Sequence, residues 1–169
     1  MSDLRKERID ELVQRLADQL LSNNIMLAAA ESCTGGGIAQ ALTALAGSSR
    51  WFDSGFVTYS NAAKQKMLCV PSSLFEPSAP GAVSEETVRA MTAGAIANSA
   101  AEMAVAVSGV AGPDGGSEDK PVGTVWIAWQ LREQGRAQRF QFSGDREAVR
   151  TATVEAGLSG LLELLEKSG

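Results

Sequence analysis

The 169-residue sequence contains no histidine, and it is poor in cysteine and aromatic side chains. Without histidine, neither a Ser-His-Asp triad nor a Cys-His pair can be built. Zinc sites also lose most of their ligands, because two cysteines and carboxylates would have to supply them. An enzyme with this sequence therefore needs a lysine, a tyrosine or a carboxylate as its base.

The sequence also lacks a long apolar run and an excess of positive charge. No segment approaches the roughly 18 apolar residues that span a bilayer, and residues 1–10 carry both charges, unlike a signal peptide. We therefore expect a cytoplasmic protein with no membrane partner. The net charge of −5 gives no general attraction to nucleic acid, so we expect no nucleic-acid partner. Cys33 and Cys69 are expected to be reduced thiols rather than a disulfide.

The length and composition of the sequence indicate one globular domain over residues 1–169. Hydrophobic residues make up 44% of the chain, and the chain is short for two domains. Apolar periodicity and turn residues predict its elements. Helices are predicted over Ile9–Leu20, Gly36–Leu45, Asn61–Leu68, Ser84–Ser99 and Asp145–Leu165. Strands are predicted over Ile25–Ala30, Phe56–Tyr59, Met103–Ser108, Thr124–Leu131 and Ala137–Ser143, the last two forming an antiparallel hairpin with a turn at Gly135.

Strands that alternate with helices, followed by a hairpin, predict an α/β fold. We expect a three-layer α/β/α sandwich with a mixed, mainly parallel sheet and a C-terminal antiparallel hairpin. Ligands of such sheets lie beyond the carboxyl ends of the parallel strands. Three predicted loops leave such ends, over residues 31–37, 59–64 and 108–116, and these loops are where the sequence places a site.

Ser32 lies where the first buried strand gives way to a glycine-rich helix start. Its hydroxyl can be exposed there while several backbone N–H groups point at the same space, which is suited to holding an anion. The alternative, which the local sequence alone favours, is that Ser32 or Thr34 only caps the helix. Cys33 is a weaker candidate nucleophile, because no histidine is available to activate its thiol.

Lys64 and Tyr59 are candidates for a base and a proton relay. Lys64 falls about one turn into the helix after the second strand and Tyr59 ends that strand, so both can face Ser32. A lysine base needs its pKa lowered from about 10.4 toward 7 or 8, and burial and a helix N-terminus act in that direction. The alternatives are a solvated lysine and a tyrosine that packs at the strand end, the latter slightly favoured by the sequence alone.

The loop over residues 108–116 is rich in glycine. Its backbone amides, with Lys120 as a mobile charge, can cradle a phosphate or a ribose, and a flexible surface turn is the alternative. Arg146 is a further phosphate candidate, beside a cap at Gly144-Asp145. The substrate-binding candidates are Thr34, Gly35, Gly36, Asn61, Ser108, Gly109, Ala111, Gly112, Gly115, Gly116, Lys120 and Arg146.

Four segments carry a more specific pattern than any of these residues alone. They are Ala29–Gly36 (AAESCTGG), Gly55–Asn61 (GFVTYSN), Gly109–Gly116 (GVAGPDGG) and Lys120–Val125 (KPVGTV). Together they resemble the CinA C-terminal-domain family, over about residues 5–165. The resemblance implies hydrolysis of nicotinamide mononucleotide to nicotinic acid mononucleotide and ammonia, in pyridine nucleotide recycling. The family's serine, tyrosine and lysine correspond to Ser32, Tyr59 and Lys64.

The mechanism that this resemblance implies is acyl transfer without a metal ion or cofactor. Lys64, helped by Tyr59, takes the Ser32 proton as the hydroxyl attacks the carboxamide carbon, and backbone amides near Thr34 to Gly36 hold the oxyanion. In many relatives this domain follows a larger one, and the resemblance here is to the stand-alone form. The loop over residues 77–81 is longer and richer in proline than the family pattern, so substrate affinity or specificity can differ there.

Two further expectations concern an alternative function and the oligomeric state. The alternative function is a non-catalytic nucleotide-sensing or partner-binding module linked to competence and DNA damage, and the joint presence of serine, tyrosine and lysine argues against it. The apolar residues in the helices of so small a chain also favour a homodimer or another homo-oligomer.

Overall fold

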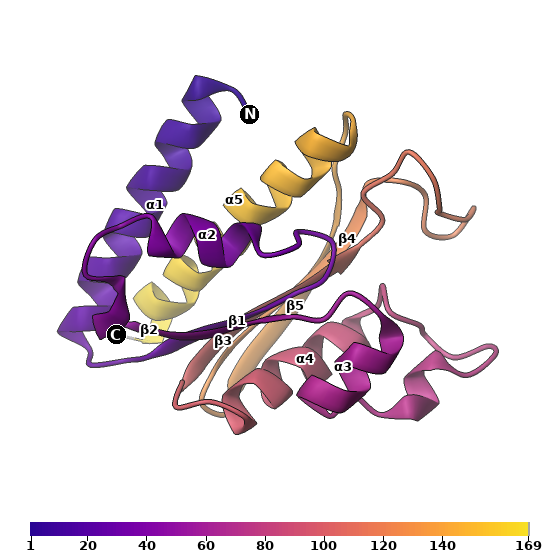
Figure 1. Cartoon of the computed structure of the whole chain (residues 1–169), viewed down its shortest axis with the longest axis horizontal. Coiled ribbons are helices and arrows are strands. Elements are labelled where there is room, and N and C mark those ends of the chain that lie inside the picture. Colours follow the sequence, from indigo (N-terminus) through magenta and orange to yellow (C-terminus); the bar gives the residue numbers. More distant parts are fainter. Residues whose placement is uncertain (169) are drawn as a thin grey trace.

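Five strands form one sheet between two layers of helices in the computed structural model, which describes residues 1–168 (Figure 1). The strands are β1 (Leu27–Glu31), β2 (Phe52–Val57), β3 (Met103–Gly109), β4 (Thr124–Leu131) and β5 (Gln134–Gln141). The helices are α1 (Asp3–Ser22), α2 (Gly37–Thr43), α3 (Asn61–Leu68), α4 (Glu85–Ala97) and α5 (Arg146–Ser168), with short 3₁₀ turns η1 (Ser48–Arg50) and η2 (Ser72–Phe75).

The strand order is β2-β1-β3-β4-β5. β1 pairs in parallel with both β2 and β3, whereas β4 is antiparallel to β3 and β5 is antiparallel to β4. The predicted α/β sandwich with a C-terminal hairpin is confirmed, with the parallel pairing confined to the β2-β1-β3 side of the sheet. The carboxyl ends of these three strands therefore lie at the same edge.

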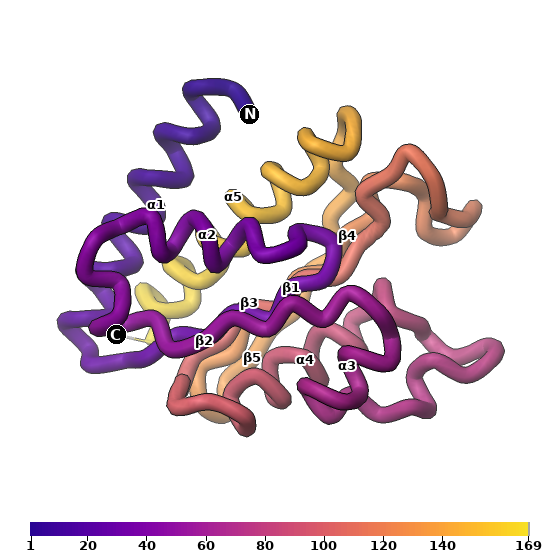
Figure 2. Tube along the Cα trace, viewed as in Figure 1, coloured from indigo at the N-terminus to yellow at the C-terminus, as the bar shows by residue number. Residues whose placement is uncertain are grey.

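The two faces of the sheet are covered by different helices. In Figures 1 and 2, α1, α2 and α5 lie on one face and α3 and α4 on the other. β1 shows why, since successive side chains of a strand point to opposite faces. Leu27 and Ala29 pack in the core under α1, α2 and α5, whereas Ala28 and Ala30 pack in the core under α3 and α4. Small side chains on β1 let both layers approach it closely.

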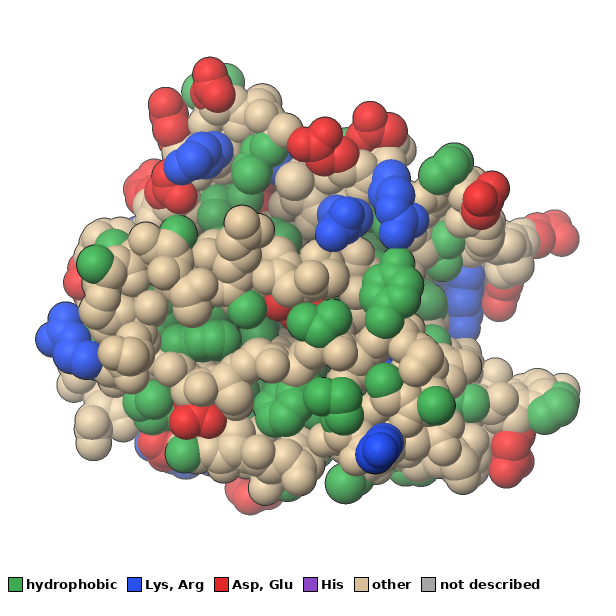
Figure 3. Space-filling view, in the orientation of Figure 1, with side chains coloured by type: hydrophobic (Ala, Val, Ile, Leu, Met, Phe, Trp, Pro, Cys, Tyr) green, Lys and Arg blue, Asp and Glu red, His purple; other side chains and the backbone are tan. Residues whose placement is uncertain are grey.

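β2 is an edge strand, and this explains where its prediction was wrong. It begins at Phe52, before the predicted start at Phe56, and it ends at Val57, which leaves Tyr59 in the following loop. Its side chains alternate between half-buried and exposed, so no continuous apolar run marks its first residues. On the face shown in Figure 3, apolar side chains form a broken band between the two helical layers, in the region where Figure 1 places β2.

The hairpin turn was also misplaced. It lies at Arg132 and Glu133, where Arg132 has a φ of 52°, rather than at Gly135, so β5 begins at Gln134 instead of Ala137. The exposed, polar start of β5 carries no apolar alternation that would reveal it as a strand. Within residues 1–168, no helix combines the length and apolarity that crossing a bilayer requires.

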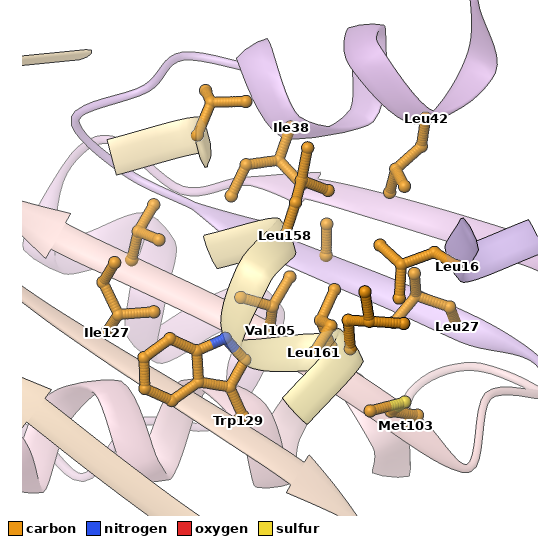
Figure 4. Packing of buried hydrophobic residues seen from close by; sticks show 14 of the residues in the cluster. Leu16, Leu27, Ile38, Leu42, Met103, Val105, Ile127, Trp129, Leu158 and Leu161 are labelled. Carbon is orange, nitrogen blue, oxygen red and sulfur yellow. The ribbon is translucent and has the colours of Figure 1, made fainter. Parts of the chain in front are cut away.

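Trp129 of β4 anchors the core beneath α5. Figure 4 shows its indole near Ile127, Leu158 and Leu161. The indole Nε1 donates a hydrogen bond of 2.8 Å to the carbonyl oxygen of Gly157. One turn further, a Cβ on Gly160 would overlap the ring, so α5 can approach β4 this closely only with glycine there.

Gly160→Ala is therefore expected to destabilise the protein, although alanine favours a helix over glycine by about 1 kcal/mol. Overpacking costs typically about 1–3 kcal/mol and occasionally more, and a Cβ that overlaps three atoms of the Trp129 ring belongs at the upper end, so this cost exceeds the gain. Urea unfolding should show a lower midpoint with an unchanged slope. Ser159→Ala is the control and should stay within about 0.5 kcal/mol of the unsubstituted protein. A more stable Gly160→Ala variant would contradict the close packing.

Candidate functional site

A cavity of about 300 Å³ lies at the carboxyl ends of β1, β2 and β3. Of the residues predicted from the sequence, it is lined by Ser32, Tyr59, Asn61, Lys64, Ser108, Gly109, Ala111, Gly112, Gly115, Gly116 and Arg146. The structure thus brings the three predicted loops to one place. Five lining residues were not among the predicted site residues, namely Cys33, Ala82, Val83, Val110 and Asp114.

Ser32 and Lys64 are in direct contact at the base of this cavity. The Nζ of Lys64 donates to the Oγ of Ser32 at 2.9 Å. The backbone N–H of Ser32 donates to the carbonyl of Val107 at 3.1 Å, which ties the residue after β1 to β3. The two side chains come from positions 32 residues apart and meet only because β1 and β2 are adjacent.

The position of Lys64 is fixed by α3. Ser60 caps this helix by accepting a hydrogen bond from the N–H of Ala63 at 3.0 Å. The far end of α3 packs against α4 at Gly94, where a Cβ would overlap the carbonyl oxygen of Leu68. Helix α3 is therefore held at both ends, and the Lys64 stem is directed back toward β1.

The amine of Lys64 is buried, with 1% of the residue exposed. Burial lowers the pKa of Lys64 from 10.5 to about 8, and the charge of a Cys33 thiolate would act in the opposite direction. About a tenth of the amine is therefore neutral at pH 7, and about half at pH 8. A neutral amine within hydrogen-bond reach of a hydroxyl is the geometry of a general base and its nucleophile.

Two backbone carbonyls orient this amine. Its Nζ also donates to the carbonyl of Thr58 at 2.8 Å and to that of Tyr59 at 3.3 Å. A neutral amine has two N–H bonds and one lone pair. The protonated amine donates in all three directions, to the two carbonyls and to Ser32 Oγ. When the amine is neutral and both N–H bonds stay on the carbonyls, its lone pair faces Ser32 and can accept the hydroxyl proton.

Tyr59 is arranged differently from the predicted relay. The residue is 60% exposed, and its hydroxyl accepts a hydrogen bond of 3.0 Å from Nη2 of Arg146. Nη1 of Arg146 donates to the carbonyl of Gly112 at 2.7 Å. The phenol therefore does not stand between Lys64 and Ser32, which bond directly. Arg146 instead links the β2 loop to the glycine-rich loop at the cavity wall.

The turn after Ser32 also departs from expectation. Thr34, Gly35 and Gly36 do not line the cavity. The N–H of Gly35 donates to the carbonyl of Ser32 at 3.0 Å, and that of Gly37 donates to the carbonyl of Thr34 at 3.0 Å. Because the Gly35 amide is already used within the turn, it is not available to an oxyanion, and the nearest lining residue after Ser32 is Cys33.

Lys120 does not line the cavity either. Its Nζ donates to the carbonyl of Pro80 at 2.6 Å, and so joins the loop after β3 to the loop before α4. These two long loops project on the same side of the molecule, at the right of Figure 2. The second loop contributes Ala82 and Val83 to the cavity wall, directly after residues 77–81, where we expected substrate affinity or specificity to differ.

Cys33 lies beside Ser32 but has the chemistry of an inert thiol. Burial raises its pKa from 9.0 to about 12, so the thiolate required of a nucleophile is absent near neutral pH. Cys33 is buried and Cys69 is exposed, and both are free thiols, as expected.

The whole chain is similar to proteins of one family. A sequence model of the CinA C-terminal domain matches residues 9–165. The nicotinamide-nucleotide amidohydrolase PncC of Pseudomonas putida is 58% identical over 156 residues, covering 92% of this chain and 96% of the relative. The protein of the same name from Escherichia coli K12 is 47% identical over 152 residues, covering 89% and 91%.

Solved structures agree with this similarity. The competence damage-inducible protein A of Klebsiella pneumoniae superposes with a TM-score of 0.89 at 41% identity, covering 94% of this chain and 97% of that one. A competence/damage-inducible protein of Agrobacterium tumefaciens gives a TM-score of 0.89 at 43% identity, with coverage of 93% and 95%.

Proposed function

The chain belongs to the CinA C-terminal domain family, and we propose that it is a nicotinamide-nucleotide amidohydrolase with a serine nucleophile and a lysine base. The proposed reaction converts nicotinamide mononucleotide and water to nicotinic acid mononucleotide and ammonia. The relatives named PncC support the substrate, at 47–58% identity. The observation that carries the mechanism is the 2.9 Å contact between Lys64 Nζ and Ser32 Oγ in a cavity.

In the first half-reaction, Ser32 Oγ attacks the carboxamide carbon while its proton passes to the lone pair of Lys64. A tetrahedral intermediate forms with its negative charge on the former carbonyl oxygen. The backbone N–H of the residue after the nucleophile is a common oxyanion donor, and here that residue is Cys33, which lines the cavity. The carbon–nitrogen bond then breaks, and the leaving nitrogen takes the proton from Lys64 and departs as ammonia.

In the second half-reaction, water attacks the ester that joins the nicotinoyl group to Ser32. Lys64 accepts a proton from this water and returns it to Ser32 Oγ as the ester bond breaks. The products are the regenerated serine and the nicotinic acid group, which releases its remaining proton to solvent and becomes a carboxylate. Lys64 thus begins and ends the cycle as a neutral amine.

The remaining lining residues suit the rest of the nucleotide. Arg146 is the cation that lines the cavity besides Lys64, and its guanidinium can pair with a phosphate. Glycines at 109, 112, 115 and 116 leave space for a ligand to approach the backbone. Asp114 lines the same wall and presents carboxylate oxygens that can accept hydrogen bonds from ribose hydroxyls.

The direct test is ammonia release from nicotinamide mononucleotide by the purified protein, with and without a chelator. We expect turnover that is indifferent to the chelator, because the proposed mechanism has no metal-dependent step. Nucleotide binding without ammonia release would instead favour the non-catalytic sensing module. The Ser32–Lys64 contact argues against that module, since nucleotide binding alone requires no oriented base.

The pH dependence of kcat/KM should follow Lys64. Because the base acts as a neutral amine and its pKa is about 8, kcat/KM should rise through pH 8 and level off above it. Below pH 7 it should fall by about tenfold per pH unit. The profile is measured from initial rates between pH 6 and pH 9.5, with Lys66→Met, an exposed lysine on the same helix, as the control that leaves it unchanged. A flat profile would contradict a lysine base.

A further inference from the structure

Glu31 is a buried carboxylate immediately before Ser32, and the mechanism above does not use it. Only 1% of the residue is exposed. Its Oε1 accepts hydrogen bonds from Thr34 Oγ1 at 2.6 Å and from the N–H of Ile38 at 2.8 Å, and its Oε2 accepts one from the N–H of Ala39 at 3.0 Å. A buried carboxylate without such donors would be very costly. Here its partners are a hydroxyl and the free amides of the first turn of α2.

The backbone between Ser32 and α2 is unusually permissive. Gly35 and Gly36 are consecutive and have φ values of +60° and +103°, a region open mainly to glycine. Such a turn does not by itself hold one conformation. Glu31 is the last residue of β1, and its side chain accepts hydrogen bonds from residues 38 and 39 of α2. These bonds join the two ends of the turn.

The main chain of Glu31 reaches the other half of the site. Its carbonyl oxygen accepts a hydrogen bond of 2.9 Å from the N–H of Thr58. The carbonyl of Thr58 in turn accepts from Lys64 Nζ at 2.8 Å. One residue therefore connects the turn that carries the nucleophile with the peptide that orients the base.

We propose that the Glu31 carboxylate is a positioning residue that fixes the Ser32 turn so that Oγ stays within bonding distance of Lys64 Nζ. The proposal rests on the proposed role of Ser32 as nucleophile. Displacing a reacting atom by about 1 Å can cost on the order of 100-fold in rate. Loosening this turn should therefore lower the reactivity of Ser32 while leaving the cavity walls, and so substrate binding, in place.

Glu31→Gln tests this directly, because the amide keeps the shape but replaces one acceptor oxygen with a donor. We expect kcat to fall by about 10- to 100-fold, with KM changed by less than about threefold. The midpoint of the pH profile should stay near 8, because the burial of Lys64 is unaltered. Thr34→Val removes one of the three donors and should give a smaller loss of the same kind. Glu86→Gln, an exposed carboxylate in the first turn of α4, is the matched control and should leave activity unchanged.

A fluorophosphonate reagent measures serine reactivity independently of the nucleotide. Ser32 Oγ bonds to phosphorus, fluoride leaves, and the proton passes to Lys64; intact mass reports the rate. We expect labelling in Glu31→Gln to slow by about the same 10- to 100-fold factor, with cooperative melting retained. Equal labelling rates in folded Glu31→Gln and the unsubstituted protein, or equal rates in Thr34→Val if Glu31→Gln does not fold, would overturn the inference.

The same measurements separate this inference from the proposed function. If the unsubstituted protein is labelled at Ser32 but releases no ammonia, the proposed substrate is wrong, while slower labelling of Glu31→Gln still supports the positioning role. If Ser32 does not react with the reagent and the protein releases no ammonia, both are overturned.

Discussion

Ser32→Ala is expected to reduce kcat for ammonia release by on the order of 10⁴-fold or more, the range seen when nucleophiles of serine hydrolases are removed. KM should change little, because the hydroxyl forms its decisive bond only as the reaction proceeds. The fold should survive, since the substitution removes one hydrogen bond and leaves Lys64 bonded to the carbonyls of Thr58 and Tyr59. Single-turnover ammonia assays measure the loss of rate, and a thermal melt checks that the fold survives.

Two control variants sharpen this result. Ser73→Ala removes an exposed serine in η2 and should be fully active. Cys33→Ser tests the neighbouring thiol, whose raised pKa makes it a poor nucleophile, and most of the activity should remain. If Ser32→Ala kept a tenth of the activity while Cys33→Ser lost it, the thiol would be the nucleophile and the serine assignment would be wrong.

Replacing Lys64 should have an effect of similar size, on the order of 10³- to 10⁴-fold in kcat. Lys64→Met keeps the apolar stem but removes the amine, so Ser32 has no group to take its proton. The plateau above pH 8 should disappear, because the ionisation that produces it belongs to Lys64. The measurement is kcat/KM across pH, on protein whose secondary structure is checked by circular dichroism.

Lys64→Arg separates a base from a mere positive charge. Arginine stays protonated at all accessible pH values and cannot accept a proton. We expect Lys64→Arg to be as inactive as Lys64→Met. An Arg variant that keeps more than a tenth of the activity would show that position 64 acts through its charge alone.

The location of this site could be predicted because its signals are local. A continuous apolar run followed by glycines indicates a buried strand that ends at a helix, and parallel strands bring such ends together. That reasoning made Ser32 and Lys64 candidates, and the resemblance to the family gave them the roles of nucleophile and base. Their side chains lie 2.9 Å apart. The absence of histidine had already reduced the possible bases to a few residue types.

The parts that were missed depend on contacts distant in sequence or on the main chain. Glu31 caps α2 from six residues before its first residue, whereas sequence reasoning looks for a cap directly before the helix. Lys120 was expected in the site because cations near glycine loops bind phosphates, but its amine bonds to Pro80 in another loop. The Tyr59 hydroxyl bonds to Arg146, 87 residues away, which no local pattern indicates.

The two carbonyls that orient Lys64 have a consequence for how the protein tolerates sequence change. In a Ser-His-Asp triad the group that orients the base is a side chain, so a single substitution can remove it. Here the orienting groups are peptide oxygens of residues 58 and 59, which every amino acid possesses. An alanine scan would therefore detect Ser32 and Lys64 but would miss this pair of carbonyls. Only a change to the backbone itself, such as an ester in place of the amide, would reveal it.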